Sequence, residues 1–444
     1  FANFDFKSMA DGIAADIGGV EVLTCDRSLP EGDPAGLPPA PTDGDEIRWY
    51  FYTSGTTADP KGAQHTDRTI YAVSAGMAGR IPVTADDRNA LAFPFPHIGG
   101  ITWLYTSLQT GSQNILFQAF IPDEVVAGLS AQDVTLAGSG TVFHQTYLAA
   151  QKKADGLIFP NIKAFPGGGA PKPPQLHYDM KEAFGVGIVS GYGLTEAPIL
   201  TMGAVTDSDD DLAHTEGAPM PGVELKLVTL DGALAGPGEE GEVRAKAPQL
   251  MKGYLDSSLD ADAFDEEGFF RTGDAVAWID ESNIHRGLRF DGRIAEDFKL
   301  ATGTFVSVGP LRAKIIAAGA PYVQDAVLTG LNLKEVGALI FPTQKVRELA
   351  GLAADAGMRE VVESAPVQAH FQRVLDALAK SATGSANRIA RLHLEHEPPS
   401  IDRGEVTDKG SINQRAVLKH RADTVEAFHA GSLPFTLKPQ GDTP

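Results

Sequence analysis

The sequence is poor in cysteine and in positive charge. A single cysteine among 444 residues rules out a disulfide within the chain and is typical of proteins in a reducing compartment. Lysine and arginine number 37 against 58 aspartates and glutamates, a net charge of −21, which argues against nucleic acid or an anionic membrane as a general partner. No apolar run approaches the roughly 20 residues that cross a bilayer. We therefore expect a cytoplasmic protein with no nucleic-acid or membrane partner.

The length and the apolar pattern predict two domains of the α/β class. Up to residue 294, short apolar runs alternate with helical patterns, which predicts parallel or mixed sheets flanked by helices. A helix is expected at Ser8–Asp16. The expected strands are Val20–Leu23, Ile47–Tyr52, Leu91–Phe95, Asn114–Phe117, Ile162–Phe165 and Val186–Val189.

Two further regions have a different pattern. Glu224–Val228 and Gly241–Ala245, separated by DGALAGPGEE, predict a small antiparallel β subdomain within the N-terminal domain. From Leu311 onward, a helix, three strand-like runs and a long helical stretch predict a small α+β C-terminal domain. The expected domains are residues 1–294 and 295–444.

Three glycine-rich stretches have the residue types of ligand-binding loops. YTSGTTADPKG, Tyr52–Gly62, offers hydroxyls, unhindered backbone N–H groups and a lysine to a phosphate, although its spacing differs from the common P-loop. FPGGGAP, Phe165–Pro171, suggests a flat ligand lying against backbone. GYGLTE, Gly191–Glu196, offers an aromatic face, a hydroxyl and a carboxylate, which suit a base, a phosphate oxygen and Mg²⁺. An ordinary loop, a core tyrosine and a solvated glutamate are the alternatives.

Charged residues later in the chain extend this pattern. FFRTGD ends in Asp274, a carboxylate that can accept hydrogen bonds from ribose hydroxyls. Arg293, Lys299 and Gly303 lie at the junction between the two expected domains, which suggests a hinge that brings charged groups to the ligand. The segment 403–421 is basic and is either a cationic finger for a phosphate or a solvated helix.

YTSGTTADPKG, GYGLTE, FRTGD and GRIAEDFKLATG occur in an order and at separations that resemble the core motifs of the adenylate-forming superfamily. This superfamily contains acyl-CoA and aryl-CoA ligases, peptide-synthetase adenylation domains and luciferases. GRIAEDFKLATGTFVSVGPLR and GEVTDKGSINQRAVL look more specifically like the feruloyl-CoA synthase branch. Members usually carry a much longer segment before the phosphate loop, so we expect the N-terminal part of the fold to be missing.

The resemblance implies an ATP-dependent acid:CoA ligase that forms an acyl-adenylate and then a thioester, with a mobile C-terminal lid. ATP, Mg²⁺ and coenzyme A would be the cofactors and co-substrates, and a small carboxylic acid the other partner. Glu196 would hold the metal, Thr195 the α-phosphate, and Asp274 the ribose with Arg293 close by. Lys409 would be the adenylation lysine.

The remaining residues are also assigned by resemblance. Lys299 and Gly303 would serve the second half-reaction, and Ala295 occupies the usual hinge position, where aspartate or lysine is common. His97 would gate the acyl pocket, or it is structural. Phosphate contacts are implied for Thr53, Ser54, Gly55, Thr56, Thr57 and Lys61, and adenine contacts for Gly168, Gly169, Ala170, Pro171, Gly191, Tyr192 and Gly193.

The acid and the acceptor are left open by the sequence. An aromatic, hydroxycinnamic-type acid is favoured, with an alicyclic or fatty acid as the alternative. The candidate pocket residues are Phe143, His144, Phe165, Val189 and Ser190. A carrier-protein acceptor, a luciferase-like oxygenase and a non-catalytic nucleotide-binding homologue are the competing hypotheses.

Overall fold

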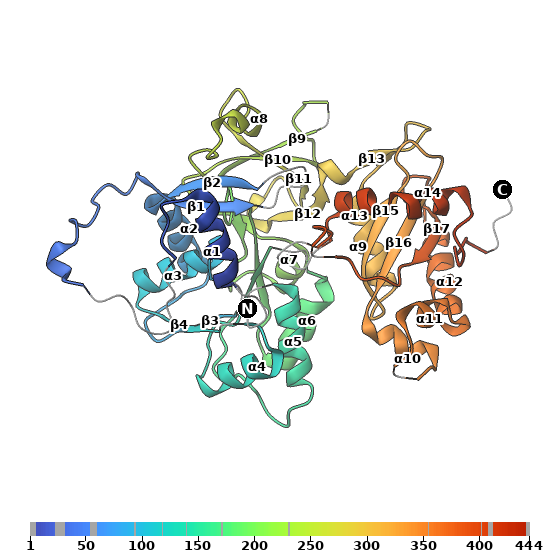
Figure 1. Ribbon diagram of the computed structural model, residues 1–444, viewed down its shortest axis with the longest axis horizontal. Coiled ribbons are helices and arrows are strands. Elements are labelled where there is room, and N and C mark those ends of the chain that lie inside the picture. The colour runs from blue at the N-terminus through green and yellow to red at the C-terminus, as the bar shows by residue number, and fades with distance from the viewer. Residues whose placement is uncertain are drawn as a thin grey trace.

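The computed structural model places a large N-terminal α/β part beside a smaller C-terminal part, drawn in orange and red in Figure 1. It describes residues 6–22, 32–53, 60–92, 95–117, 119–138, 140–169, 172–229, 231–353, 355–400, 402–406 and 412–440. The expected fold class is confirmed: mixed sheets flanked by helices, an antiparallel β unit and a small α+β unit. The boundary between residues 294 and 295 stays a prediction.

A mixed sheet forms the centre of the N-terminal part. Its strands are β3 (Arg88–Leu91), β4 (Gln113–Leu116), β5 (Phe165–Gly168), β6 (Ile188–Tyr192), β7 (Thr201–Met202) and β8 (Ala218–Pro219). β3 is parallel to β4 and β5 is parallel to β6, whereas β7 and β8 pair antiparallel. Bridges on both sides of Leu136 join the two parallel pairs. The carboxyl ends of β5 and β6 therefore meet at one edge, where open α/β sheets bind ligands.

Helices cover both faces of this sheet because both faces are apolar. The helices of the N-terminal part are α1 (Phe6–Ile17), α2 (Asp67–Arg80), α3 (Ile98–Thr110), α4 (Pro122–Ala131), α5 (Thr141–Gln151), α6 (Pro174–Phe184), α7 (Asp209–His214) and α8 (Asp260–Ala263). Ile188 packs with α4, α5 and α6, and Val189 packs with α2 and α3 on the other side. Since side chains alternate along a strand, Ser190 and Tyr192 lie on the face of Ile188.

Local capping contributes to the start of α2. The Thr66 hydroxyl accepts a hydrogen bond from the Thr69 backbone N–H at 3.2 Å, and the Thr69 hydroxyl accepts one from the Thr66 N–H at 3.1 Å. This reciprocal capping box satisfies N–H groups that have no partner within the helix. It also fixes the direction in which β2 (Lys61–Thr66) leads into α2.

A second, antiparallel sheet follows in the order β12-β11-β10-β9. Its strands are β9 (Glu224–Val228), β10 (Gly241–Lys246), β11 (Phe270–Trp278) and β12 (Leu288–Arg293), and a separate hairpin consists of β1 (Ile47–Thr53) and β2 (Lys61–Thr66). The core over this sheet contains Val243 and Val276, together with Tyr192 from β6 and Ala63 from β2. The three sheets therefore converge around Tyr192.

The C-terminal part has its own core. Its strands are the hairpin β13 (Phe298–Lys299) and β14 (Phe305–Val306) and the sheet β15 (Val323–Thr329), β16 (Val336–Pro342) and β17 (Ile389–Leu394). Its helices are α9 (Val308–Ala318), α10 (Arg347–Ala350), α11 (Met358–Glu363), α12 (Ala365–Lys380), α13 (Gln414–His420) and α14 (Ala422–Ala430). Phe371 of α12 is buried on one side of the sheet and Phe428 of α14 on the other.

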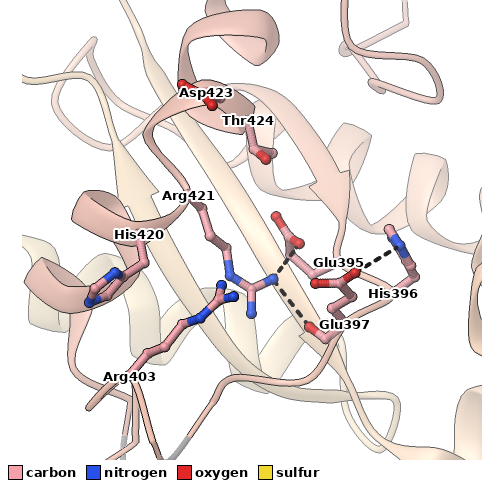
Figure 2. A pocket seen from close by; sticks show the side chains of 8 residues that line it. All are labelled: Glu395, His396, Glu397, Arg403, His420, Arg421, Asp423 and Thr424. Carbon is pink, nitrogen blue, oxygen red and sulfur yellow. Dashed lines mark hydrogen bonds and ion pairs between the residues drawn. The ribbon is translucent and has the colours of Figure 1, made fainter.

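Arg421 ties the last helices to this sheet (Figure 2). Its guanidinium donates to Glu395 Oε2 at 2.6 Å and to Glu405 Oε2 at 3.0 Å, and lies 4.9 Å from the centre of the Phe341 ring. Arg421 and Glu395 border a cavity of about 250 Å³ that is also lined by Arg403. Because removing one member of a buried ion pair leaves the other charge unpaired, we assign Arg421 a structural role.

Three of the predicted strands are wrong in detail. The strand expected at Leu91–Phe95 shares only Leu91 with β3. Residues 20–22 belong to no strand, and Leu23 lies outside the described residues; an apolar run becomes a strand only when a neighbour pairs with its backbone. The strand expected at Ile162–Phe165 begins instead at Phe165 and includes Gly167 and Gly168. In the part of the chain that the structure describes, no helix has the length and apolar character needed to cross a membrane.

Carboxylates gather where β12 leads into the C-terminal part. Asp297 Oδ1 accepts a hydrogen bond from the Val308 N–H at 2.8 Å. Burial raises the pKa of Asp297 to about 6, and the charges of Glu240, Glu296 and Asp291 add to this rise. Ionised Asp297 therefore destabilises the folded protein at neutral pH.

We expect Asp297→Asn to stabilise the protein above about pH 6, because the amide keeps the Val308 hydrogen bond without the charge. The folded state binds this proton more tightly than the unfolded state, so the wild type loses stability as the pH rises from about 4 to about 6. The gain should be on the order of 2 kcal/mol at pH 8 and vanish near pH 4. Thermal unfolding at both pH values measures it, with exposed Asp155→Asn as the control. Equal shifts at both pH values would contradict this explanation.

Candidate functional site

Tyr192 and Asp274 join the central sheet to the antiparallel sheet. The Tyr192 hydroxyl, at the end of β6, donates to Asp274 Oδ2 in β11 at 2.9 Å. Burial, followed by the charge of Asp274, raises the pKa of Tyr192, so the phenol remains a neutral donor. Arg293 pairs with Asp274 across the strand ladder and brings its Nε to 3.6 Å from Asp274 Oδ1. The structure therefore brings these three predicted site residues together.

Tyr254 contacts both Glu196 and Lys61. Glu196 is 9% exposed, and its Oε1 accepts a hydrogen bond from the Tyr254 hydroxyl at 2.9 Å. Lys61 Nζ lies 5.3 Å from the centre of the Tyr254 ring. Burial and the charge of Glu196 raise the pKa of Tyr254, so Tyr254 also acts as a neutral donor. The Tyr254 side chain thus contacts the Lys61 ammonium group with its ring and the Glu196 carboxylate with its hydroxyl.

His65 holds the loop that carries Thr195. His65 is fully buried, and its Nε2 lies 2.9 Å from the Thr195 carbonyl oxygen. Burial lowers the pKa of His65 to about 4, which leaves the ring neutral at physiological pH. Since a carbonyl oxygen only accepts, Nε2 carries the proton and donates it. This hydrogen bond from β2 therefore fixes the position of the Thr195 backbone.

Bare backbone lines the adjoining edge of the central sheet. Gly168 and Gly191 pair in register, and a Cβ on Gly168 would lie 2.9 Å from the Gly191 carbonyl oxygen. A Cβ on Gly193 would lie 2.2 Å from the Ile199 nitrogen. Gly169 has φ +77°, a left-handed conformation that favours glycine. Side chains are therefore excluded from this edge, and a flat group can lie close to the backbone.

The two ends of the predicted phosphate loop also meet. Thr53, the last residue of β1, pairs with Lys61, the first residue of β2. The hairpin therefore brings the two ends of the loop together, and Lys61 at one of these ends lies beside Tyr254. Several predicted residues lie outside the described residues, namely Ser54, Gly55, Thr56, Thr57, Ala170, Pro171 and Lys409.

His97, Lys299 and Gly303 are not among the residues that meet around Tyr192 and Tyr254. His97 precedes α3, and its Nδ1 accepts a hydrogen bond from the Gly99 N–H at 3.0 Å, which is the contact of a helix cap. Lys299 and Gly303 are exposed in the β13–β14 hairpin, where Lys299 pairs with Phe305. Ala295 lies in a short helical turn at Ile294–Glu296. The proposed roles of His97, Lys299 and Gly303 stay predictions.

The five candidate acyl-pocket residues do not share one surface. Phe143 packs against Phe120 with ring centres 4.4 Å apart. Phe165 is fully buried and belongs to the core beneath α5 and α6, whereas Val189 belongs to the core on the opposite face. Ser190 is therefore separated from Val189 by the sheet itself.

Two residues of the site had no role assigned from the sequence: His65 and Tyr254. His65 follows Ala63 by two positions, and both are buried in β2, so the period of two is the one signal that could have indicated it. Tyr254 lies 58 positions after Glu196, and only the bridge between Ala63 and Tyr254 brings it to the site.

The residues fit a metal that is held mainly by ligand oxygens. Within the described ranges, no three histidines, cysteines or carboxylates form a group that could hold a metal ion. A Mg²⁺ ion bound through substrate phosphates needs only one or two protein carboxylates. Glu196 supplies one, and no described residue donates a hydrogen bond to its Oε2.

Comparisons with known proteins identify relatives of this chain. The family model for the AMP-binding enzyme matches residues 9–255, and the model for the AMP-binding enzyme C-terminal domain matches residues 298–432. The 2-succinylbenzoate–CoA ligase of Bacillus subtilis strain 168 is 27% identical over 293 residues, which are 66% of this chain and 58% of the relative. The medium-chain fatty-acid–CoA ligase of Escherichia coli K12 is 29% identical over 301 residues, which are 67% of this chain and 51% of the relative.

A solved structure shares the fold. ATP-bound MatB from Rhodopseudomonas palustris superposes with a TM-score of 0.69 at 21% identity, covering 86% of this chain and 70% of that structure. The chain spans a little more than half the length of the two ligases named above. On the match of the first family model to more than half of its residues, the chain belongs to the AMP-binding enzyme family.

Proposed function

We propose that this protein is an AMP-forming acid:CoA ligase that uses ATP and Mg²⁺. The observation that carries the proposal is the convergence of Lys61, Tyr254 and Glu196 on the same edge as the Tyr192–Asp274 pair. A cation, a buried carboxylate and a second carboxylate beside bare backbone suit a phosphate, a metal and a ribose with its base. Membership of the AMP-binding family supports this assignment.

Each residue then has a role in charge placement. Thr53 to Thr57 and Lys61 hold the β- and γ-phosphates, Thr195 contacts the α-phosphate, and Glu196 holds Mg²⁺. Asp274 accepts from the ribose hydroxyls with Arg293 beside it. The adenine lies between Tyr192 and the Gly168–Pro171 segment.

The reaction has two displacements at one site. An oxygen of the acid attacks the α-phosphorus, pyrophosphate leaves, and an acyl-adenylate forms. The CoA thiol then loses its proton and attacks the acyl carbon, and AMP leaves. Lys409 stabilises negative charge in the first displacement, while Lys299 and Gly303 act in the second.

The acid is proposed to be aromatic, of the hydroxycinnamic type found with the feruloyl-CoA synthase branch. The feruloyl-like C-terminal segments support this choice, and the succinylbenzoate ligase is a relative that acts on an aromatic acid. The medium-chain fatty-acid ligase supports a fatty acid as the second candidate. A cytoplasmic location belongs to the same proposal, supported by the single cysteine, Cys25.

AMP release from Mg·ATP tests the activity directly. We expect release with ferulate and CoA together, and much less with benzoates or medium-chain fatty acids. Ferulate-dependent pyrophosphate release without CoA, followed by no thioester with CoA, would point to a carrier-protein acceptor. No turnover with any acid would overturn the ligase assignment.

Lys409→Ala should separate the two half-reactions. We expect acyl-adenylate formation to fall by at least about 100-fold, because a charge-stabilising donor is lost, while transfer from preformed acyl-adenylate to CoA changes less. Stopped-flow pyrophosphate release and single-turnover thioester formation measure the two steps. Lys419→Ala, at an exposed position on α13, is the control. Equal losses in both steps would remove Lys409 from this role.

Tyr254→Phe should weaken the use of Mg²⁺. The variant keeps the ring beside Lys61 but removes the hydrogen bond that orients Glu196, a loss of about 1 kcal/mol or roughly fivefold. We expect the Mg²⁺ concentration for half-maximal adenylation to rise by about that factor while the KM for the acid stays constant. Exposed Tyr71→Phe is the matched control. An unchanged Mg²⁺ requirement would show that Tyr254 does not position Glu196.

A further inference from the structure

The loop that follows β6 contains a strained residue. Ile199 has φ +47°, a left-handed conformation that is rare for a side chain branched at Cβ. Residues 193–200 form this loop between β6 and β7, so Ile199 lies three positions after Glu196. Such strain persists only where other contacts hold the backbone, and it is concentrated at functional sites. The contacts that hold Ile199 therefore bear on Glu196.

The loop folds back on itself around Glu196. The Leu194 N–H donates to the Ala197 carbonyl oxygen at 3.1 Å, and this hydrogen bond encloses Glu196 in a tight turn. Ile199 follows the turn by two positions, and its nitrogen lies against Gly193, where a Cβ would be only 2.2 Å away. A change in the backbone conformation of Ile199 therefore displaces the turn that carries Glu196.

A segment from another part of the chain holds this loop. We call residues 249–255 the strap. Gln249 is 1% exposed, and its Nε2 donates to the Ile199 carbonyl oxygen at 3.0 Å. Two positions later, the Met251 N–H donates to the Glu196 carbonyl oxygen at 2.9 Å. The strap thus holds both the strained residue and the backbone of Glu196.

The other end of the strap pairs with the β1–β2 hairpin. The Gln64 N–H donates to the Gly253 carbonyl oxygen at 3.0 Å, and Gln64 Nε2 donates to the Tyr254 carbonyl oxygen at 2.8 Å. Gln64 belongs to β2, the strand that begins at Lys61. The strap therefore connects the Glu196 loop to the strand that carries Lys61.

We propose that Gln249 is a positioning residue that holds Glu196 in its metal-binding orientation through the strained backbone of Ile199. The Gln249 amide stabilises the left-handed conformation, and without it Ile199 relaxes toward negative φ and the turn shifts. Tyr254 restrains the Glu196 carboxylate, whereas Gln249 restrains the backbone of the same loop. The inference rests on the proposed function only in that Glu196 binds the Mg²⁺ of bound ATP.

Calorimetric binding of ATP with Mg²⁺ and with EDTA, in the absence of acid and CoA, tests the inference. We expect the wild type to bind ATP more tightly with Mg²⁺. Gln249→Met keeps an unbranched side chain but removes the amide, so it should reduce the ratio of the two affinities by about fivefold. The affinity in EDTA should stay unchanged. Gln132→Met, at an exposed position at the end of α4, is the matched control.

A double-mutant cycle with Ile199→Gly separates this role from a general loss of structure. Glycine adopts positive φ without strain, so Gln249→Met should lower the ratio by less than about twofold in the Ile199→Gly background. A purely structural hydrogen bond would cost the same in both backgrounds. Thermal unfolding confirms that the compared proteins are folded. If Gln249→Met is unfolded, Gln249→Asn replaces it, because the shorter side chain withdraws the amide from the carbonyl oxygen.

An unchanged affinity ratio in the folded Gln249 variant overturns the inference. Equal weakening with Mg²⁺ and with EDTA overturns it as well, and so does a loss of the ratio that persists in the Ile199→Gly background. A wild type that binds ATP equally with and without Mg²⁺ removes the metal role of Glu196 and the inference with it. Failure of the ligase assay is a separate result, because these affinities are measured without any acid.

Discussion

The hydrogen bond between Tyr192 and Asp274 links two sheets that otherwise have separate strand ladders. Tyr192 ends a strand of the central sheet, yet its ring packs in the core of the antiparallel sheet. The buried phenol needs a partner for its hydroxyl, and a buried carboxylate needs a donor. Each group therefore satisfies the other, and the site forms around this junction.

In the proposed function, the site around this junction also shows how a strongly acidic chain would hold an anionic ligand. The site does not depend on a basic surface, since Lys61 and Arg293 are single cations placed against Tyr254 and Asp274. The buried carboxylates act through hydrogen bonds and, in the proposed function, through a metal. Net charge describes solubility and general partners, whereas ligand binding is set by the few groups that converge.

The fold and the motif residues were largely predictable, and the supporting contacts were not. Strands such as Ile389–Leu394 have a clear apolar pattern and occur where expected. Gly167 and Gly168 were expected in a loop because glycine is rare in strands. They belong instead to strand β5, because their backbone pairs with β6. Tyr254 reaches the site through long-range packing, for which neighbouring residues in the sequence give no signal. Lys409 and most of the phosphate loop remain predictions from motif alone.

In the proposed function, the pairing of Asp274 with Arg293 has a consequence for how long the acyl-adenylate stays bound. Arg293 is the last residue of β12, and the chain enters the turn toward the C-terminal part at the next residue. If the C-terminal part rotates about this turn, the pivot lies immediately after the paired residues Asp274 and Arg293. In the proposed function, the contacts to the ribose would then belong to the N-terminal part, which does not move in this rotation. Dissociation of the acyl-adenylate and reorientation of the C-terminal part would thereby be separate events with separate rates.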